Sequence, residues 1–377
     1  YTWSQIPPEI SATGDQLYCP LSEQNVVTYF NIIPGTEQID AIFIQISENY
    51  KINEDSLILT NQLSHLNITT SWISNEGKLT LTALTPSATA YLDLIAAVKD
   101  VVFESNSNAI SGEKHFSFTL DEANYLPSTD HYYEYVQDIG ITWTNAKIAA
   151  EGRNYYGLQG YLATITSQEE AQLSGEQAAG AGWIGGSDLE TEDVWKWVTG
   201  PEAGSTFWFG RGNGTTNGAD YPFANWNPPN EPNNAGGTSG EDYAHIVHPQ
   251  LPSANKGEWN DLPNEGFVDG GTNYYEPKGY IVEYGGMPGD PILNISASTK
   301  ISVPEISSIT EGSNCGIGTV SLSATTTLGV TILWFDSLTG GNKLGSGPNF
   351  TTPSISSTTT FYALASSNGV CEEGVRT

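Results

Sequence analysis

The sequence is poor in basic residues and in long apolar runs. Only 13 of its 377 residues are Lys or Arg, against 43 Asp or Glu, so the formal net charge is -30. A protein that binds duplex DNA or RNA needs a basic surface to neutralise phosphates, and this composition excludes such a partner. No stretch approaches the roughly 20 consecutive apolar residues of a membrane-spanning helix. We therefore expect no nucleic-acid partner and no transmembrane segment in this chain.

Methionine and cysteine are also scarce, with one Met and the three cysteines Cys19, Cys315 and Cys371. Cys315 and Cys371 flank one C-terminal segment and could close a disulfide, which would imply an oxidising compartment. Cys19 is left over and is interpreted as a small buried apolar residue. The chain starts at Tyr1 without a Met, which is consistent with removal of a signal peptide.

Glycine is abundant, with 40 residues, and Ser, Thr and Asn are frequent, whereas Lys/Glu-rich helical tracts are missing. This composition favours short strands joined by turns. The length predicts two or three domains, and Pro/Gly/Ser-rich joints lie near 124–131 and 285–292. We predict a mostly β, multidomain chain with boundaries at 1–125, 126–287 and 288–377.

Strand-like runs with turn residues between them fill the first predicted domain, at 41–47, 56–60 and 78–84. The stretch 50–120 contains "INEDSLIL", "GKLTLTA", "LIAAVKDVVFESNS" and "HFSFTL". It resembles a cadherin-like, proteoglycan-type repeat. The resemblance implies a β-sandwich that acts as a spacer.

The third predicted domain alternates apolar and polar residues in "GTVSLSAT", "VTILWFD" and "FYALAS". Trp334 sits in the middle of a strand, where a sandwich core needs a large anchor. The segment resembles the immunoglobulin-like repeats of large surface proteins that gliding bacteria secrete by the type IX route. The resemblance implies a secreted protein of the bacterial cell surface. Because a last strand should continue past Thr377, we expect a truncated domain and a longer protein.

The middle segment differs from its neighbours because two helical patterns lie between two strands, 131–136 and 279–284. The first helix is predicted from an N-cap at Thr142 to Glu151. The second starts at Ser167, which with a Glu three residues on forms a capping box, and ends at Gly180. About 60 residues with few periodic signals follow, and so long an irregular stretch is usually functional.

Three tripeptides mark this irregular stretch: Trp183-Ile184-Gly185, Glu231-Pro232-Asn233 and Trp259-Asn260-Asp261. Each is a weak signal alone, but the ordered set, preceded by two helices, is specific. It resembles the C-type lectin family, with its "WIG", "EPN" and "WND" signatures, over 131–284. The resemblance implies an α+β C-type lectin fold with two helices and a long loop region.

By this resemblance the principal calcium ligands are Glu231, Asn233, Glu241, Asn260 and Asp261. Calcium takes six to eight hard oxygen ligands, and these side chains offer five, with the Asp261 carbonyl as a sixth. Two coordination positions would remain for vicinal sugar hydroxyls. Glu231 with Asn233, and Glu241 with Asn260, would each hold one hydroxyl, since a Glu/Asn pair supplies both an acceptor and a donor.

The family also implies a ligand class and a second ion. Glu-Pro-Asn at this place goes with mannose-, glucose- or fucose-type ligands, and the Glu-Pro bond is cis when calcium is bound. Asp188, Glu192 and Asp242 match an auxiliary calcium site that Glu241 could bridge. Asn234 stands where that site commonly has an acidic ligand.

Two features depart from the family pattern. Residues 131–284 contain no Cys, whereas the family usually has two disulfides, so loop rigidity rests more on calcium. The spans 201–225 and 249–277 look longer than a minimal domain and carry aromatic residues. These rings either stack on sugars or pack under their own loops.

No nucleophile triad and no phosphate-binding glycine loop occurs in a convincing context, and carboxylate pairs mean little in so acidic a chain. We therefore expect no enzyme. The predicted function is calcium-dependent binding of glycans or glycoproteins by a secreted cell-surface adhesin, with other cell-surface or secretion-system proteins as further partners. The alternative is a protein-binding C-type lectin-like domain in which calcium only orders the loops.

Overall fold

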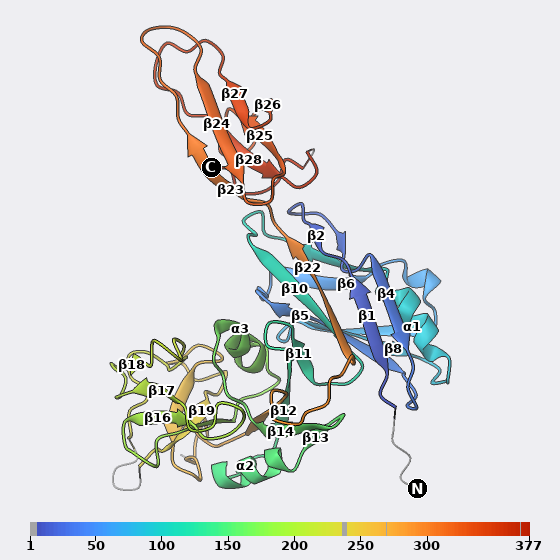
Figure 1. Ribbon diagram of the computed structural model, residues 1–377, viewed down its shortest axis with the longest axis vertical. Coiled ribbons are helices and arrows are strands. Elements are labelled where there is room, and N and C mark those ends of the chain that lie inside the picture. Colours follow the sequence, from blue (N-terminus) through green and yellow to red (C-terminus); the bar gives the residue numbers. More distant parts are fainter. Residues whose placement is uncertain (1–5, 236–239, 269, 370) are drawn as a thin grey trace.

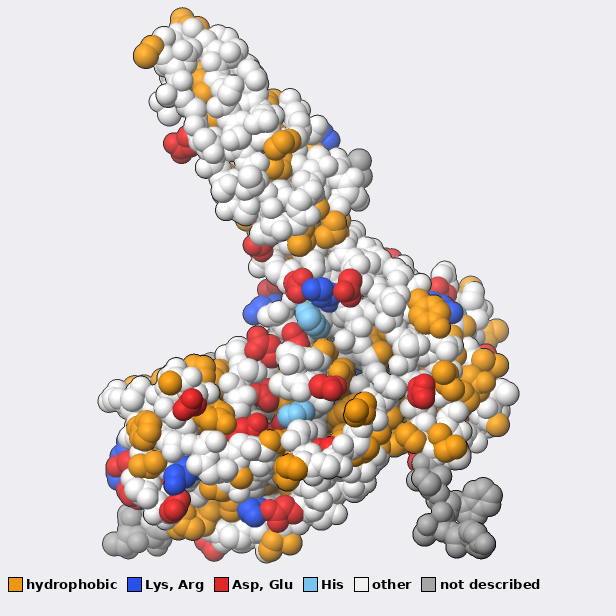
Figure 2. Space-filling view, viewed as in Figure 1, with side chains coloured by type: hydrophobic (Ala, Val, Ile, Leu, Met, Phe, Trp, Pro, Cys, Tyr) orange, Lys and Arg blue, Asp and Glu red, His pale blue; other side chains and the backbone are white. Residues whose placement is uncertain are grey.

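The computed structural model describes residues 6–235, 240–268, 270–369 and 371–377. It contains three β-rich domains, of which the third projects as a narrow arm from the broader pair formed by the first and middle domains (Figure 1). Acidic side chains border the recess between the first and middle domains (Figure 2). The prediction of a mostly β, multidomain chain is confirmed.

The first domain is built on a six-stranded sheet. Its strands, in spatial order, are β2 (Gln16–Leu17), β22 (Ser296–Ser302), β10 (Glu113–Thr119), β5 (Ala41–Glu48), β8 (Lys78–Ala83) and β7 (Ile68–Ile73). Because side chains alternate along a strand, Ile42, Ile44 and Ile46 of β5 all reach the core, together with Leu79 and Leu81 of β8. Each such buried aliphatic side chain contributes about 1.5–3 kcal/mol.

Smaller elements close the other side of this core. They are the sheet of β3 (Gln24–Asn25), β9 (Val101–Ser105) and β6 (Asp55–Leu59), the pair β1 (Glu9–Thr13) and β4 (Tyr29–Ile33), helix α1 (Ala90–Val98) and a 3-10 turn (Gln62–Ser64). Phe103 of β9 packs against Phe116 of β10 with 5.5 Å between ring centroids. The two sheets therefore share one apolar interior.

Strand β22 lies in the first domain although it follows the middle domain in the sequence. It pairs antiparallel with β10, from Glu113 opposite Ser302 to Thr119 opposite Ser296, and parallel with β2. The predicted start of the third domain at residue 288 is thereby corrected, because 296–302 complete the first sheet. The middle domain is an insertion into the first.

The strands of the middle domain are mostly short, with β12 and β21 the longest. They are β11 (Asn124–Leu126), β12 (His131–Gln137), β13 (Asn154–Tyr155), β14 (Leu158–Leu162), β15 (Trp183–Ser187), β16 (Val194–Trp197), β17 (Thr206–Phe209), β18 (Thr215–Thr216), β19 (Tyr243–Ile246), β20 (Trp259–Leu262) and β21 (Gly279–Tyr284). The first and last long strands, β12 and β21, pair antiparallel. The domain therefore enters and leaves the first domain at one place.

Two helices of the middle domain begin where the sequence predicts. Helix α2 (Trp143–Glu151) has Thr142 as its N-cap, whose Oγ1 accepts a hydrogen bond from the Asn145 N–H at 3.2 Å. Helix α3 (Gln168–Ala171) is capped by Ser167 in the same way. It continues as one wider π-helical segment, Gln172–Glu176, so the expected extension to Gly180 is wrong by about one turn.

The third domain packs two three-stranded sheets. One consists of β23 (Ile306–Thr310), β24 (Ser321–Thr326) and β27 (Asn349–Thr351), the other of β26 (Lys343–Ser346), β25 (Thr331–Phe335) and β28 (Tyr362–Ser366). Trp334 is buried between them and stacks on Phe350 with 5.3 Å between ring centroids. The prediction that Trp334 anchors a sandwich core is confirmed.

The disulfide joins Cys19 to Cys371, and Cys315 is a free, exposed cysteine. The predicted Cys315–Cys371 pair is therefore wrong. The segment after β28 returns to the first domain, where the Gly374 N–H donates to Asn108 Oδ1 at 2.7 Å. This contact brings the Cα atoms of Cys19 and Cys371 to 5.8 Å, a usual disulfide spacing, whereas Cys315 lies in the loop between β23 and β24.

The first and middle domains are joined by buried hydrogen bonds. The side-chain amide of Gln177 donates to the carbonyl oxygen of Ile46 at 2.9 Å and to that of Glu76 at 2.7 Å. On the other side, the hydroxyls of Tyr132 and Ser296 lie 2.7 Å apart. Among the described residues, no helix is long and apolar enough to cross a membrane.

Candidate functional site

The candidate site lies where three irregular segments meet strand β20. Asn225 and Asn227 flank Trp226 and exchange backbone hydrogen bonds with Trp259, at 2.8 and 2.9 Å. Trp226 is buried against Trp195, with 4.7 Å between ring centroids. This anchorage places the turn that follows Asn227 directly beside Asp261 on β20.

Asp261 is the centre of the site and is 2% exposed. Its carboxylate accepts the backbone N–H of Asn233 at 2.8 Å and that of Asn234 at 2.7 Å. The Asn233 side chain donates to Glu231 Oε2 at 2.6 Å, and the Glu231–Pro232 peptide bond is cis. The Glu-Pro-Asn turn is thus wrapped around the Asp261 carboxylate.

Glu241 is bonded to the same turn from the other side. Its Oε2 accepts the N–H of Ala235 at 2.6 Å, and its backbone N–H donates to Asn234 Oδ1 at 2.9 Å. The structure therefore links Glu231, Asn233, Glu241 and Asp261 through one hydrogen-bonded turn, although Glu231 and Asp261 lie 30 residues apart.

Several carboxylates lie close together in the site, and their burial and mutual repulsion raise their pKa values. Burial, a hydrogen bond with Asp261 and the charges of Asp261 and Glu241 raise the pKa of Glu231 to about 9. Burial also raises the pKa of Asp261. Burial raises the pKa of Asp188 to about 7, with the charges of Glu192, Asp242 and Asp261 adding to it. A bound cation would reverse these shifts, because it stabilises the charged carboxylates.

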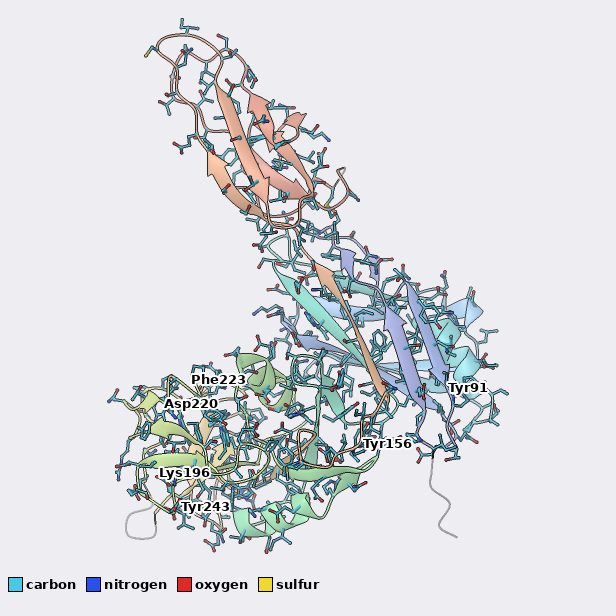
Figure 3. All side chains as sticks on the ribbon, viewed as in Figure 1. Tyr91, Tyr156, Lys196, Asp220, Phe223 and Tyr243 are labelled. Atoms are coloured by element: carbon cyan, nitrogen blue, oxygen red, sulfur yellow. A yellow bond between two sulfur atoms is a disulfide. The ribbon has the colours of Figure 1, made fainter. Side chains whose placement is uncertain are left out.

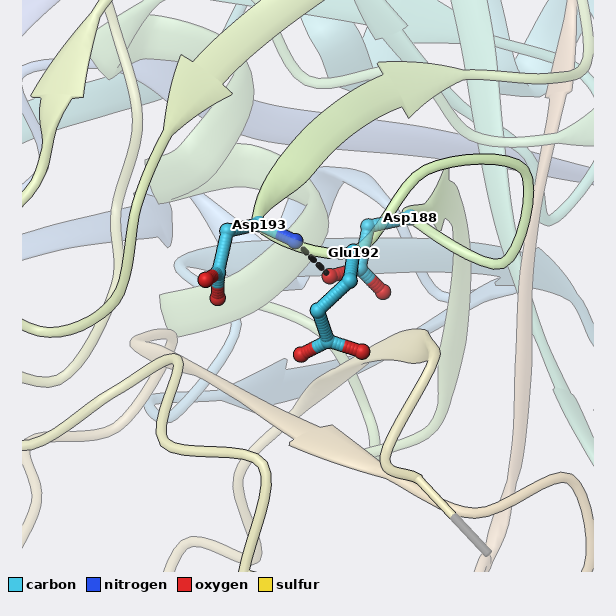
Figure 4. A group of neighbouring side chains, drawn as sticks. All are labelled: Asp188, Glu192 and Asp193. Atoms are coloured by element: carbon cyan, nitrogen blue, oxygen red, sulfur yellow. Dashed lines mark hydrogen bonds between the residues drawn. The ribbon is translucent and has the colours of Figure 1, made fainter.

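A second acidic group lies next to the turn. Side-chain oxygens of Asp188, Glu192 and Asp193 all lie within 4.8 Å of one another (Figure 4). The Asp193 N–H donates to Asp188 Oδ2 at 3.0 Å, and the Asp188 N–H donates to the carbonyl oxygen of Asp242 at 3.2 Å. The sequence motifs point to Asp188, Glu192 and Asp242 but not to Asp193, whose only signal is the acidic run "GSDLETED".

Arg211 is a second residue of the site that no sequence motif marks. Its guanidinium donates to Asp193 Oδ1 at 2.9 Å and to Glu192 Oε1 at 3.1 Å. It reaches the site from the tip between β17 and β18, inside the predicted insertion 201–225. Its only sequence signal is that it is the single basic residue of that span, set between two glycines.

Asn260 precedes Asp261 on β20 and contacts the neighbouring strand through its side-chain oxygen. It is 3% exposed, and its Oδ1 lies 3.2 Å from Nδ1 of His245 on the neighbouring strand β19. Successive side chains of a strand point to opposite faces, so Asp261 faces the Glu-Pro-Asn turn while Asn260 faces His245. Burial lowers the pKa of His245 to about 4, so this histidine is neutral.

The donor set fits a hard cation such as calcium. Among the described residues, the side-chain oxygens Asp188 Oδ1 and Asn233 Oδ1 are buried and have no hydrogen-bond donor. Buried polar atoms normally have a partner, and carboxylate and amide oxygens are the ligands that calcium prefers. Glu231, Asn233, Glu241 and Asp261 would hold the ion.

The aromatic residues of the insertion divide between core and surface. Phe207 is fully buried and stacks on Trp197 with 4.2 Å between ring centroids, and the Trp208 Nε1–H donates to the carbonyl oxygen of Gly210 at 2.9 Å. Phe209, in contrast, is 42% exposed, as is Leu189 at 63%. Phe207 therefore packs under its own loop, and Phe209 is left on the surface beside Arg211.

Two comparisons with known proteins find relatives of this chain. The family of Ig-like domains described as CHU_C associated matches residues 302–377, so the third domain is Ig-like, and the match begins where β22 ends. Halomucin of Haloquadratum walsbyi is 30% identical over 308 residues, which cover 79% of this chain. The chain spans about 3% of the length of halomucin.

Proposed function

We propose that the middle domain is a C-type lectin-like domain that binds glycans through one calcium ion. The observation that carries the proposal is the convergence of Glu231, Asn233, Glu241 and Asp261 on one hydrogen-bonded turn. Together with the donor-poor oxygens beside them, this is the arrangement that a hard cation stabilises. In this proposal the domain binds a ligand and catalyses no reaction.

Calcium supplies a Lewis-acidic position for two vicinal hydroxyls when it is bound. Glu231 and Asn233 present a carboxylate acceptor and an amide donor 2.6 Å apart. A sugar hydroxyl both donates and accepts, so this pair matches one hydroxyl of a mannose-, glucose- or fucose-type ring. Glu241 with Asn260 would hold the second hydroxyl, although the Asn260 Oδ1 also lies 3.2 Å from His245 Nδ1.

The setting of the domain suits an adhesin. An Ig-like third domain and the similarity to halomucin favour a surface or secreted protein, and the type IX route is part of the proposal. A shallow site that holds two hydroxyls binds in about the millimolar range, or about -4 kcal/mol. Adhesion would then depend on many copies at a surface.

The test is a glycan array probed with the intact chain in millimolar calcium and again in EDTA. Binding to mannose- or fucose-type glycans that EDTA abolishes is the expected result. Asp261→Asn should abolish it, whereas Asp220→Asn, at an exposed carboxylate of the same domain (Figure 3), should not. The double variant Glu231→Gln, Asn233→Asp should move the preference toward galactose.

A second candidate function is recognition of a protein surface, with calcium only ordering the loops. The exposed side chains of Leu189 and Phe209 favour it, since Leu189 lies within the acidic loop 188–193 and Phe209 pairs with Val194 at the end of that loop. This candidate predicts calcium-dependent stability without glycan binding. An array that stays blank while calcium raises the unfolding temperature would select it over the lectin proposal.

A further inference from the structure

The second acidic group already contains a positive charge. Arg211 spans Asp193 and Glu192 with separate nitrogens of one guanidinium, at 2.9 and 3.1 Å. A third nitrogen lies 3.4 Å from the carbonyl oxygen of Asn233. The guanidinium therefore reaches the same carboxylates that a second cation would need, as well as the Glu-Pro-Asn turn.

The loop between β17 and β18, which carries Arg211, is held in place by close backbone contacts. Gly212 packs so closely on the neighbouring turn that a Cβ there would lie 2.0 Å from the carbonyl oxygen of Pro229. The Gly210 N–H donates to the carbonyl oxygen of Asp193 at 2.7 Å, and the Trp208 indole holds the Gly210 carbonyl. These contacts keep Arg211 at a high effective concentration next to the acidic group.

A second side chain acts in the same sense. The Asn234 amide donates to Glu192 Oε1, the same oxygen that accepts from Arg211. Asp188, by contrast, is 4% exposed, and its Oδ1 is buried without a donor among the described residues. The group thus retains one buried oxygen without a donor, while its exposed carboxylates are already paired with Arg211.

Building on the proposed calcium site, we propose that Arg211 replaces the second cation, so that the chain binds one calcium ion instead of two. Removing the guanidinium frees Glu192 and Asp193 beside Asp188. It also removes a positive charge that repels a divalent ion at close range. In water, the repulsion between one positive charge and a divalent ion about 4 Å away lowers the affinity for the ion by about tenfold or more.

The experiment counts calcium ions bound to the intact chain, by equilibrium dialysis with elemental analysis and by titration calorimetry. Wild type should bind one ion and Arg211→Ala two. Lys196→Ala is the matched control, because Lys196 of β16 pairs with Glu190 of the acidic loop at 2.5 Å and has no ion pair with the three acidic residues among the described residues. This control should still bind one ion.

Each outcome separates the two proposals. Two ions in wild type, or one ion in a folded Arg211→Ala, would overturn the role of Arg211 and leave the first calcium site standing. No ion in wild type would overturn the calcium site itself. If Arg211→Ala unfolds in EDTA, Arg211→Gln keeps a donor without the charge and should also bind two ions.

Discussion

The middle domain buries two groups of carboxylates, and the two groups differ in how many hydrogen-bond donors their oxygens have. In the first group, Glu170 and Glu283 are almost fully buried, and every oxygen has a donor. Glu170 accepts from the Tyr133 hydroxyl at 2.7 Å and from the N–H and hydroxyl of Thr166 at 2.6 and 2.7 Å. Glu283 accepts from the N–H of Thr164 at 2.8 Å and contacts a ring nitrogen of His131 at 2.6 Å.

The candidate site forms the second group, and it has fewer hydrogen-bond donors than buried side-chain oxygens need. Asp261 is bonded by backbone N–H groups, but Asp188 Oδ1 and Asn233 Oδ1 are buried without donors in the described part of the chain. A buried carboxylate with a full set of donors is a structural element, whereas one without a full set retains capacity for a ligand. Donor supply, more than burial or charge, distinguishes the two groups.

The largest expected effect is in the structural group. Glu283→Ala leaves His131 and the Thr164 N–H facing an apolar gap, and loss of one partner of a buried charged network costs about 3 kcal/mol or more. Urea unfolding should show this loss equally in calcium and in EDTA. A loss that appears only in one of the two conditions would mean that Glu283 belongs with the calcium site.

Calcium itself should produce the next largest effect. At about 100 times its dissociation constant, a ligand that binds only the folded state adds about 2.7 kcal/mol. Asp261→Asn should lose this increment and should cost less than Glu283→Ala in EDTA. Thermal unfolding of both variants with and without calcium measures the difference, and an increment that survives in Asp261→Asn would exclude Asp261 as a ligand.

Calcium affinity should depend on pH. In the calcium-free protein the pKa of Glu231 is raised to about 9, above its ordinary value near 4.5, so the folded state holds an extra proton between these limits. Its contribution to stability is present below about pH 4.5 and is lost as the pH rises toward 9. Calcium must displace this proton, so its affinity should rise with pH by up to about tenfold per unit.

Titrations near pH 6 and pH 8 measure this dependence. The structural group provides the internal reference. Burial, followed by the charge of Glu283, raises the pKa of Glu170 to about 7. Its part of the pH slope in unfolding should therefore remain when calcium is present, while the part from Glu231 should disappear. A calcium affinity that is flat with pH would contradict the protonated state of Glu231.

The smallest effect is expected where a carboxylate is neither buried nor short of donors. Asp220 is exposed, so water solvates its carboxylate. Asp220→Asn should change the unfolding free energy by no more than about 0.5 kcal/mol in either condition. A larger change would show that net charge alone, in a chain of -30, controls stability.

Local signals in the sequence predicted the elements well. The strand expected at 279–284 is β21 with the same bounds, and the helix capped by Thr142 ends at Glu151 as predicted. Both depend on neighbours within a few residues, either alternation or a cap. The second helix ends early because Gln172–Glu176 widens into a π segment, a change that no residue in that stretch announces.

The candidate site was predictable where a motif carries its own geometry. Glu231, Asn233 and Asp261 come from motifs that one turn and one strand bring together. Asn260 stays a prediction, since its described contact is to His245, and Asp193 and Arg211 were missed because their partners are set by loop packing. These contacts depend on how Gly212 meets Pro229, which neighbouring residues do not encode.

Long-range pairing was the part that the sequence could not supply. Strand β22 joins β10 across more than the whole middle domain, and Cys19 meets Cys371 at a sequence separation of 352 residues. Spacing favoured Cys315 because it is nearer to Cys371. The choice between the two cysteines depends on how the third domain docks on the first, through contacts such as Gly374 to Asn108.

The Cys19–Cys371 bond has a mechanical consequence. It closes residues 20–370 into one covalent loop, so tension applied between a point before Cys19 and a point after Cys371 passes directly across the sulfur atoms. The segment between them bears none of that load, and the middle domain, whose two ends are additionally tied together by β12 and β21, can be neither stretched nor unravelled by it. The Glu-Pro-Asn turn would keep its shape under a pulling force for as long as this bond is oxidised.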